Sequence, residues 1–304
     1  MKKEHPGVPG GGALRAKEAM EWIMKTVFLV CGFIAIAFVL LITVYLIISG
    51  LPAIREVGLT DFLFGTRWAS TDKTDPAYGI LPFILTSIYG TAGAILIGVP
   101  IGFLTAVFLS KVAPPKVAAV IRPAVDLLAG IPSVVYGLVG MIVLVPAIQK
   151  TFSLSSGACL LAAILVLAVM ILPSIINVSE TALRAVPHEY EEASLALGAT
   201  EMETSFRVVL PAARSGVATA VVLGVGRAIG EAMAIIMVAG NVSNMPGLFT
   251  PVRFLTTGIV SGMAYAAVGS LYQQALYSIA LVLFLFIMLI NVVLNCFIKK
   301  RKEG

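Results

Sequence analysis

Six long apolar segments separated by shorter polar ones dominate the hydrophobic pattern of this chain. They cover residues 23–49, 83–110, 118–148, 157–182, 214–240 and 274–298. A helix needs about 20 apolar residues to cross the hydrocarbon core of a bilayer, and each segment is long enough. Irregular backbone exposed to lipid leaves polar groups unpaired, so these segments are expected to be helical. The pattern predicts an all-α, polytopic membrane protein with six transmembrane helices.

The regions around these segments refine the picture. Residues 1–20 are polar and glycine-rich and are expected to form a flexible cytoplasmic tail, which leaves residues 21–304 as one transmembrane domain. No small-residue cleavage site ends the first apolar segment, so we expect it to be a retained span rather than a signal peptide. Pro132 predicts a kink within the third span. A short interfacial helix is expected within 251–267.

Composition supports the membrane assignment. The chain is 59% hydrophobic and 12% charged, whereas globular domains carry roughly 25% charged residues. The net charge of +5 does not indicate a nucleic-acid partner, because the basic residues are scattered at the ends of spans. With both termini in the cytoplasm, 15 lysines and arginines lie inside and 5 outside, with Arg227 within the membrane. The excess of positive charge inside predicts this orientation, in the cell (inner) membrane.

A polar segment, residues 183–213, interrupts the apolar pattern between the fourth and fifth spans. Its carboxylates are too costly to bury in hydrocarbon, so the segment is expected to lie in the cytoplasm. They are Glu189, Glu191, Glu192, Glu201 and Glu203.

The same segment predicts two short helices joined by a glycine turn. Pro187 suits the first position of a helix, and Gly198 suits the left-handed position that follows a helix end. Thr200 and Glu203 match a capping box at the start of a second helix, which is expected to end before Pro211. Tyr190, Leu197, Met202 and Phe206 offer apolar anchors for a partner's groove. From the residues alone, the segment is either a docking element or an ordinary amphipathic loop.

Two charged residues lie inside the fifth span. Arg227 and Glu231 are four residues apart, so they share a helix face and are expected to pair. A charge near the centre of a membrane costs roughly 2.5–3.5 kcal/mol on insertion scales. The pair is either a self-neutralising structural element or part of a gated anion pathway, for which the planar donor fork of an arginine is well suited.

Two further pairs with the same spacing lie near the inner ends of spans. Asp126 is expected to pair with Arg122 in the third span, and Glu180 with Arg184 in the fourth. We interpret both pairs as anchors of helix ends rather than as parts of a pathway.

The sequence carries no sign of catalysis. It contains no Gly-Lys dipeptide and therefore no P-loop, so any ATP has to be hydrolysed by another chain. The two histidines, His5 and His188, provide no plausible base for a serine or cysteine nucleophile. The three cysteines show no metal-ligand spacing. We expect no catalytic site, no metal site and no cofactor.

The polar segment resembles the EAA loop of ABC importer permeases. The matching residues are Glu192-Ala193-Ser194, Gly198, Val208 and Leu210-Pro211, with serine in place of the second alanine and valine in place of isoleucine. This resemblance implies a type I ABC importer permease-like fold. It also implies that Glu192, Ala193, Gly198, Leu210 and Pro211 belong to a coupling helix that seats in a cleft of an ATPase subunit.

Three further runs resemble the phosphate-uptake permeases of the Pst system. They are Tyr78–Pro82, Gly130–Ser133 and Gly226–Glu231, and the outer loop with Arg67-Trp68 is more similar to the PstC-like than to the PstA-like branch. The resemblance implies a PstA-like second permease subunit, two PstB-like ATPase subunits and an external PstS-like phosphate-binding protein. It also implies ATP-driven phosphate import by alternating access, with Arg227 and Glu231 in the substrate pathway.

Other functions fit part of the pattern. An importer of another oxyanion, such as sulfate, molybdate or phosphonate, would use the same arginine chemistry. An ion-coupled secondary transporter would show an inverted repeat and interrupted spans, and we find no convincing repeat. A membrane scaffold or signalling subunit would leave Arg227 and Glu231 unexplained.

Overall fold

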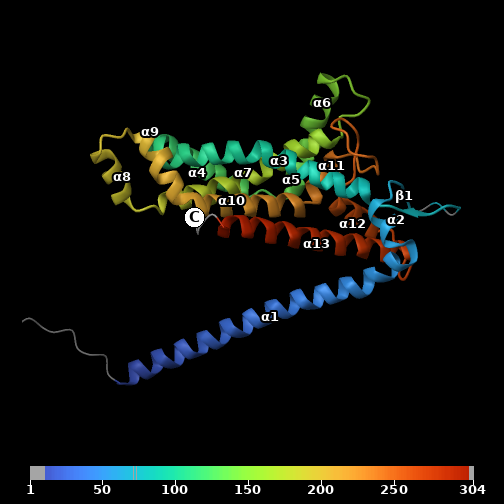
Figure 1. Cartoon of the computed structure of the whole chain (residues 1–304), viewed down its shortest axis with the longest axis horizontal. Helices are drawn as coiled ribbons and strands as arrows, with labels where there is room; N and C mark the ends of the chain where they lie inside the picture. Colours follow the sequence, from blue (N-terminus) through green and yellow to red (C-terminus); the bar gives the residue numbers. More distant parts are fainter. Residues whose placement is uncertain (1–10, 71, 73, 301–304) are drawn as a thin grey trace, which may run out of the picture. The chain divides into compact units, whose positions relative to one another are not determined.

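The computed structural model describes residues 11–70, 72 and 74–300, and this part of the chain is mostly helical (Figure 1). The chain forms two compact units that divide after Ser49 rather than after residue 20. The first helix, α1, covers Gly11–Val57, so residues 11–20 are helical and not a tail. Good helix formers such as Ala13 and Leu14 explain this early start. Residues 1–10 of the predicted tail lie outside the described residues.

Six helices within the described residues are long and apolar enough to cross a membrane, which confirms the predicted number. They are Met20–Val57, Leu81–Val112, Ser133–Thr151, Leu160–Arg184, Glu201–Gly230 and Leu271–Leu294. Each overlaps one predicted span, although the third and fifth differ from the prediction in their limits.

Several of these spans consist of more than one helical element. The elements of the second unit are α2 Leu59–Phe64, β1 Trp68–Ala69, β2 Ala77–Tyr78, α3 Leu81–Val107, η1 Phe108–Val112, α4 Pro115–Gly130, α5 Ser133–Val139, η2 Gly140–Leu144, α6 Val145–Thr151, α7 Leu160–Arg184, α8 His188–Ala196, α9 Glu201–Thr204, η3 Ser205–Val209, α10 Leu210–Gly230, α11 Met233–Val238, α12 Leu255–Met263 and α13 Leu271–Lys300. The short helix α12 confirms the helix predicted within 251–267.

The prediction of one kinked third span over 118–148 was wrong. The helix α4 stops at Gly130, and Ile131 and Pro132 are extended, with ψ angles of 127° and 140°. A proline disfavours helical backbone in the residue before it, which accounts for a break instead of a kink. The crossing helix therefore starts at Ser133. The helix α4 is a separate element that buries Ala118 and Val125.

The fifth span starts earlier and ends earlier than the predicted 214–240. Pro211 does not break the helix, which runs from Glu201 to Gly230 through the π-helical turn η3. A proline ring normally clashes with the carbonyl four residues before it, here that of Arg207. Arg207 lies inside the wider π-helical turn, which relieves the clash. At the other end, Glu231 is extended with ψ 131° and separates α10 from α11.

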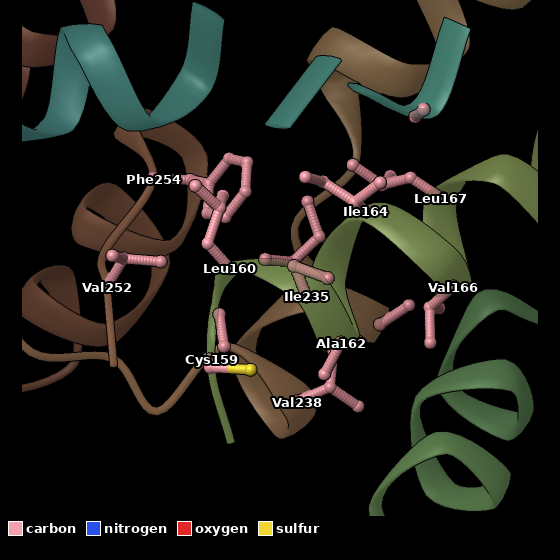
Figure 2. Close-up of a cluster of buried hydrophobic side chains, with 14 of the residues drawn as sticks. Cys159, Leu160, Ala162, Ile164, Val166, Leu167, Ile235, Val238, Val252 and Phe254 are labelled. Atoms are coloured by element: carbon pink, nitrogen blue, oxygen red, sulfur yellow. The ribbon is translucent and has the colours of Figure 1, made fainter. Parts of the chain in front are cut away.

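The core is organised around α7. Figure 2 shows α7 side chains such as Leu160 and Ile164 facing Ile235 and Val238 of α11 and the neighbouring Phe254. The helix α3 packs closely along α7 because glycines of α3 face isoleucines of α7. A methyl group added at Gly98 would come within 2.7 Å of Ile171. Small residues commonly permit such close approach between membrane helices.

The two ends of the second unit carry different structures. The helices α8 and α9 lie at one end, beside the C-terminal end of α13 (Figure 1). The opposite end carries α2, α12 and a short antiparallel hairpin in which Trp68 pairs with Tyr78. The predicted polar segment and the predicted outer loop are thus separated by the length of the bundle.

Candidate functional site

The segment α8–α9 has the local structure that its sequence predicts. Pro187 precedes α8 and Gly198 follows it with a φ of +88°, in the left-handed region. The Glu203 N–H donates to Thr200 Oγ1 at 3.2 Å, and the Thr200 N–H donates to Glu203 Oε2 at 3.1 Å. This reciprocal pair is a capping box, so both helix boundaries are fixed by local chemistry.

The apolar side chains of this segment are exposed. Leu197 is 90% exposed, and Tyr190, Met202 and Phe206 are exposed as well. Leu195, which sequence reasoning missed, is also exposed. Large apolar side chains gathered on an otherwise polar surface mark an interaction site. Among the described residues, this end of the bundle therefore carries five exposed large apolar side chains.

The motif residues divide between this surface and the bundle. Glu192, Ala193 and Gly198 are exposed, and Glu192 lies 3.7 Å from His188 within the same helix. Leu210 is half-buried against the cluster that contains Leu183 and Val209. Pro211 is exposed in the first turn of α10. The first three residues are accessible to a partner, whereas Leu210 anchors the segment to the spans.

An ion pair connects α8 to the bundle. Lys111 Nζ in η1 pairs with Glu191 Oε1 in α8, and the two side chains are only 15% and 19% exposed. Within the segment, the Ser194 and Thr204 hydroxyls are 2.8 Å apart and hold α8 against the start of the next helix. Lys111 and Glu191 are 80 residues apart, so no local sequence pattern could have predicted their pairing.

The structure does not form the predicted pair between Arg227 and Glu231. Arg227 Nη1 donates to Ser174 Oγ in α7 at 3.3 Å. The Glu231 side chain accepts from the Ala234 N–H at 3.0 Å and so caps α11, and its carbonyl accepts from Thr256 Oγ1 at 2.7 Å. The physical reason is the break after Gly230, which removes the continuous helix that the i, i+4 argument assumed.

The polar residues of α7 connect it to α4. The predicted pair between Arg122 and Asp126 was wrong, because Arg122 Nε donates to Glu180 at 2.7 Å and Asp126 accepts from Asn177 at 2.9 Å. The predicted pair between Glu180 and Arg184 was confirmed, with a distance of 3.0 Å. Since α4 is a separate helix packed on α7, its charged side chains find partners across the interface.

The side chains Ser174, Asn177 and Arg184 follow one another along α7 at helical spacing. This face runs from the neighbourhood of Arg227 toward the end that carries α8. All three side chains are at least partly accessible. Each of the three already has a polar partner, because Ser174 accepts from Arg227, Asn177 donates to Asp126 and Arg184 pairs with Glu180.

The opposite end carries its own charged contacts. Asp72 accepts from the side chain and backbone of Thr74 and pairs with Arg67 at 3.2 Å. The hydrogen bonds from Thr74, more than the charge of Arg67, lower the pKa of Asp72. Arg253 donates to the Asn241 carbonyl at 2.7 Å and lies over the Phe83 ring. Burial lowers the pKa of Arg253 from its usual high value.

Curated relatives place this architecture in a known group. A probable ABC transporter permease, YqgH of Bacillus subtilis (strain 168), is 43% identical over 268 residues, which cover 86% of each chain. The phosphate transport system permease PstC of Xylella fastidiosa (strain 9a5c) is 34% identical over 322 residues, which cover 97% of this chain and 96% of that one.

Solved structures show the same fold at low sequence identity. The methionine ABC transporter MetNI in an inward-facing form aligns with a TM-score of 0.58 and 22% identity, over 73% of this chain and 95% of that one. A bacterial alginate ABC transporter aligns with a TM-score of 0.58 and 16% identity, over 93% and 94% of the two chains. The fold is therefore that of the type I ABC permeases.

A family model described as the inner membrane component of binding-protein-dependent transport systems matches residues 98–300. The match covers the segment α8–α9 and all the spans from the third onward. Together with the relatives, it establishes that this chain belongs to the family of binding-protein-dependent transport permeases, the membrane subunits of ABC transporters.

Proposed function

We propose that this chain is the channel-forming subunit of an ATP-driven phosphate importer. The observation that carries the proposal is the exposed helix–glycine–helix segment α8–α9 between the fourth and fifth spans. In a permease without a P-loop of its own, such a surface gives a soluble ATPase a place to act. Phosphate is favoured as the substrate because relatives that cover most of the chain are phosphate transport permeases.

In this proposal, Glu192, Ala193 and Gly198 contact the ATPase directly. All three are exposed, and the neighbouring exposed side chains of Tyr190 and Leu197 would fill a groove in the partner. Leu210 and Pro211 join the segment to the fifth span and convert its displacement into movement of α10. Each catalytic cycle of the ATPase would then alternate the access of the pathway between the two sides of the membrane.

The substrate pathway is proposed to pass Arg227. Its guanidinium is partly accessible and donates to a neutral hydroxyl, so its charge is not neutralised by an ion pair within the described residues. A guanidinium presents two parallel donors that match two oxygens of an oxyanion. Glu231, which we also assign to this pathway, follows the end of α10 and accepts from the Ala234 N–H of α11. Another oxyanion, such as sulfate, molybdate or phosphonate, would satisfy the same chemistry.

The complete importer is proposed to contain a PstA-like second permease subunit, two PstB-like ATPase subunits and an external PstS-like phosphate-binding protein. We place both termini in the cytoplasm. The basic end of α13 and the segment α8–α9 lie at the same end of the second unit, as this orientation requires.

The test is uptake of labelled phosphate by membrane vesicles that contain the complete complex, with ATP enclosed. We expect uptake that requires ATP and the loaded binding protein, and a loss of uptake in Arg227→Gln while the complex still assembles. Arg55→Gln is the matched control, since Arg55 is exposed near the end of α1. Normal uptake by Arg227→Gln would contradict the pathway. Stronger competition by sulfate, molybdate or phosphonate than by unlabelled phosphate would favour the alternative substrate.

A further inference from the structure

The segment α8–α9 is attached to the bundle at more than its two chain ends. Along the chain, α8 follows α7 and α9 leads into α10. The third attachment is the ion pair between Lys111 and Glu191, which links α8 to the end of α3. Within the described residues, this ion pair joins α8 to a span that is not its neighbour along the chain.

Glu191 differs from the other acidic residues of α8. Glu189 and Glu192 are exposed, and Glu192 lies beside His188 of its own helix. The Glu191 side chain is only 19% exposed and points to a lysine that is 15% exposed. A charge-assisted hydrogen bond that is largely shielded from water is stronger than one at an open surface. This pair is thus suited to keep α8 and the end of α3 in contact when α8 moves.

Lys111, the partner at the end of α3, lies in a backbone segment that is not a regular α-helix. Lys111 belongs to the π-helical turn η1, which ends just before Pro114. Arg122 Nη2 donates to the Leu109 carbonyl in the same turn at 2.9 Å, and Arg122 also pairs with Glu180 of α7. Turns of this kind are frequent at functional positions in helices. The end of α3 is therefore held by α4 and α7 as well as by α8.

The far end of α3 contacts the region of the break beside Arg227. The Leu255 N–H of α12 donates to Ser87 Oγ of α3 at 3.0 Å. Phe254 packs on Gly90 of α3 so closely that an added methyl group would lie 2.4 Å from its ring. The next residue of α12, Thr256, donates to the Glu231 carbonyl at 2.7 Å. A continuous series of contacts thus runs from α8 along α3 to Glu231.

We propose that Lys111 and Glu191 are positioning residues that carry movement of α8 into α3, and through α12 to the break between α10 and α11. This inference rests on the proposed function, since it presumes an ATPase that moves α8. Movement along the chain alone would reach α7 and α10 directly. The ion pair makes α3 move together with α7 and α10, so that the contacts of α3 with α8 and with α12 change at the same time.

The experiment uses the complete complex in lipid vesicles and measures three quantities for each variant. They are ATPase subunit retained on purification, ATP hydrolysed with and without loaded binding protein, and phosphate taken up per ATP hydrolysed. The variants are Lys111→Met, Glu191→Gln, the exchange Lys111→Glu with Glu191→Lys, and Lys111→Arg. Lys116→Met is the matched control, because Lys116 is exposed on α4.

Both single neutral variants are expected to retain the ATPase subunit and basal hydrolysis but to lose phosphate taken up per ATP. Coupling between sites is typically worth 5–150-fold, so we expect a loss within that range. The charge exchange and Lys111→Arg should each keep most of the unaltered ratio of phosphate to ATP, and Lys116→Met should keep all of it. A role in folding or docking alone would instead lower the amount of ATPase subunit retained.

Three results would overturn the proposal. They are an unchanged ratio of phosphate to ATP in the neutral variants, a loss of the ATPase subunit in them, and a charge exchange no better than the single variants. Failure of the unaltered complex to couple ATP to phosphate uptake would refute the proposed function instead. The two failures are therefore distinguishable within one set of measurements.

Discussion

Substitution of Gly198 tests whether the turn between α8 and α9 fixes the shape of the surface offered to the ATPase. Gly198 has a φ of +88°, and a methyl group added there would meet nothing within 4 Å. The cost of Gly198→Ala therefore comes from the backbone alone, about 1–2 kcal/mol for an L-residue in the left-handed region. Asparagine tolerates this region better than alanine, and a β-branched residue tolerates it worse.

This energy sets the size of the expected effect. A penalty of about 1–2 kcal/mol changes an equilibrium by a factor of about 5–30. If that penalty reduces the population of the binding-competent turn, the apparent Kd for the ATPase subunit rises by at most the same factor. We expect the Kd to increase in the order Gly198, Gly198→Asn, Gly198→Ala, Gly198→Val.

The assay is titration of the purified ATPase subunit onto the permease complex in lipid nanodiscs, with phosphate uptake in vesicles as a second measurement. Gly130→Ala is the matched control, because Gly130 also has open space around it but lies in ordinary helical backbone. Equal affinities for all the Gly198 variants, or weaker binding by Gly198→Asn than by Gly198→Ala, would show that the left-handed turn does not set the affinity for the ATPase.

Two further predictions concern charged contacts away from this turn. The first uses double-mutant cycles measured by thermal unfolding of the complex. The pair of Arg122 with Glu180 should show a coupling of about 1–2 kcal/mol, and the more exposed i, i+4 pair of Arg184 with Glu180 about 0.5 kcal/mol. The opposite order would contradict the docking of α4 through Glu180. The lowered pKa of Asp72 means that its contribution to the hairpin of β1 and β2 is fully present above its ordinary pKa of 3.8 and is lost as pH falls through the lower folded value. Fluorescence of Trp68 in a Trp22→Phe background should therefore report loosening of the hairpin in acid. The substitution Asp72→Asn should remove this acid dependence. An unchanged acid response in Asp72→Asn would contradict the role of the Asp72 carboxylate in the hairpin.

Features set by neighbouring residues were predictable from the sequence. The capping box at Thr200 and the left-handed turn at Gly198 depend on chemistry within four residues, and both were confirmed. The number of spans was also confirmed, because bilayer thickness fixes how many apolar residues a span needs.

The errors arose where tertiary structure overrode a local rule. The i, i+4 rule failed for Arg227 and Glu231 because the helix breaks between them, and for Arg122 and Asp126 because α7 supplies better partners. Pro211 did not end a helix because the π-helical turn before it accommodates the ring. The pairing of Lys111 with Glu191 depends on how α3 approaches α8, which no window of sequence contains.

In the proposed mechanism, an ATPase acts on the membrane subunit through the exposed segment α8–α9. The most direct measurement is photo-crosslinking in intact cells, with a photoreactive phenylalanine analogue at Leu197, which is 90% exposed. The matched position is Tyr265, 88% exposed after α12 at the opposite end of the second unit. We expect Leu197 to capture the ATPase subunit and Tyr265 not to capture it. Capture of the ATPase from Tyr265, or capture of only an external protein or of nothing from Leu197, would contradict this mechanism.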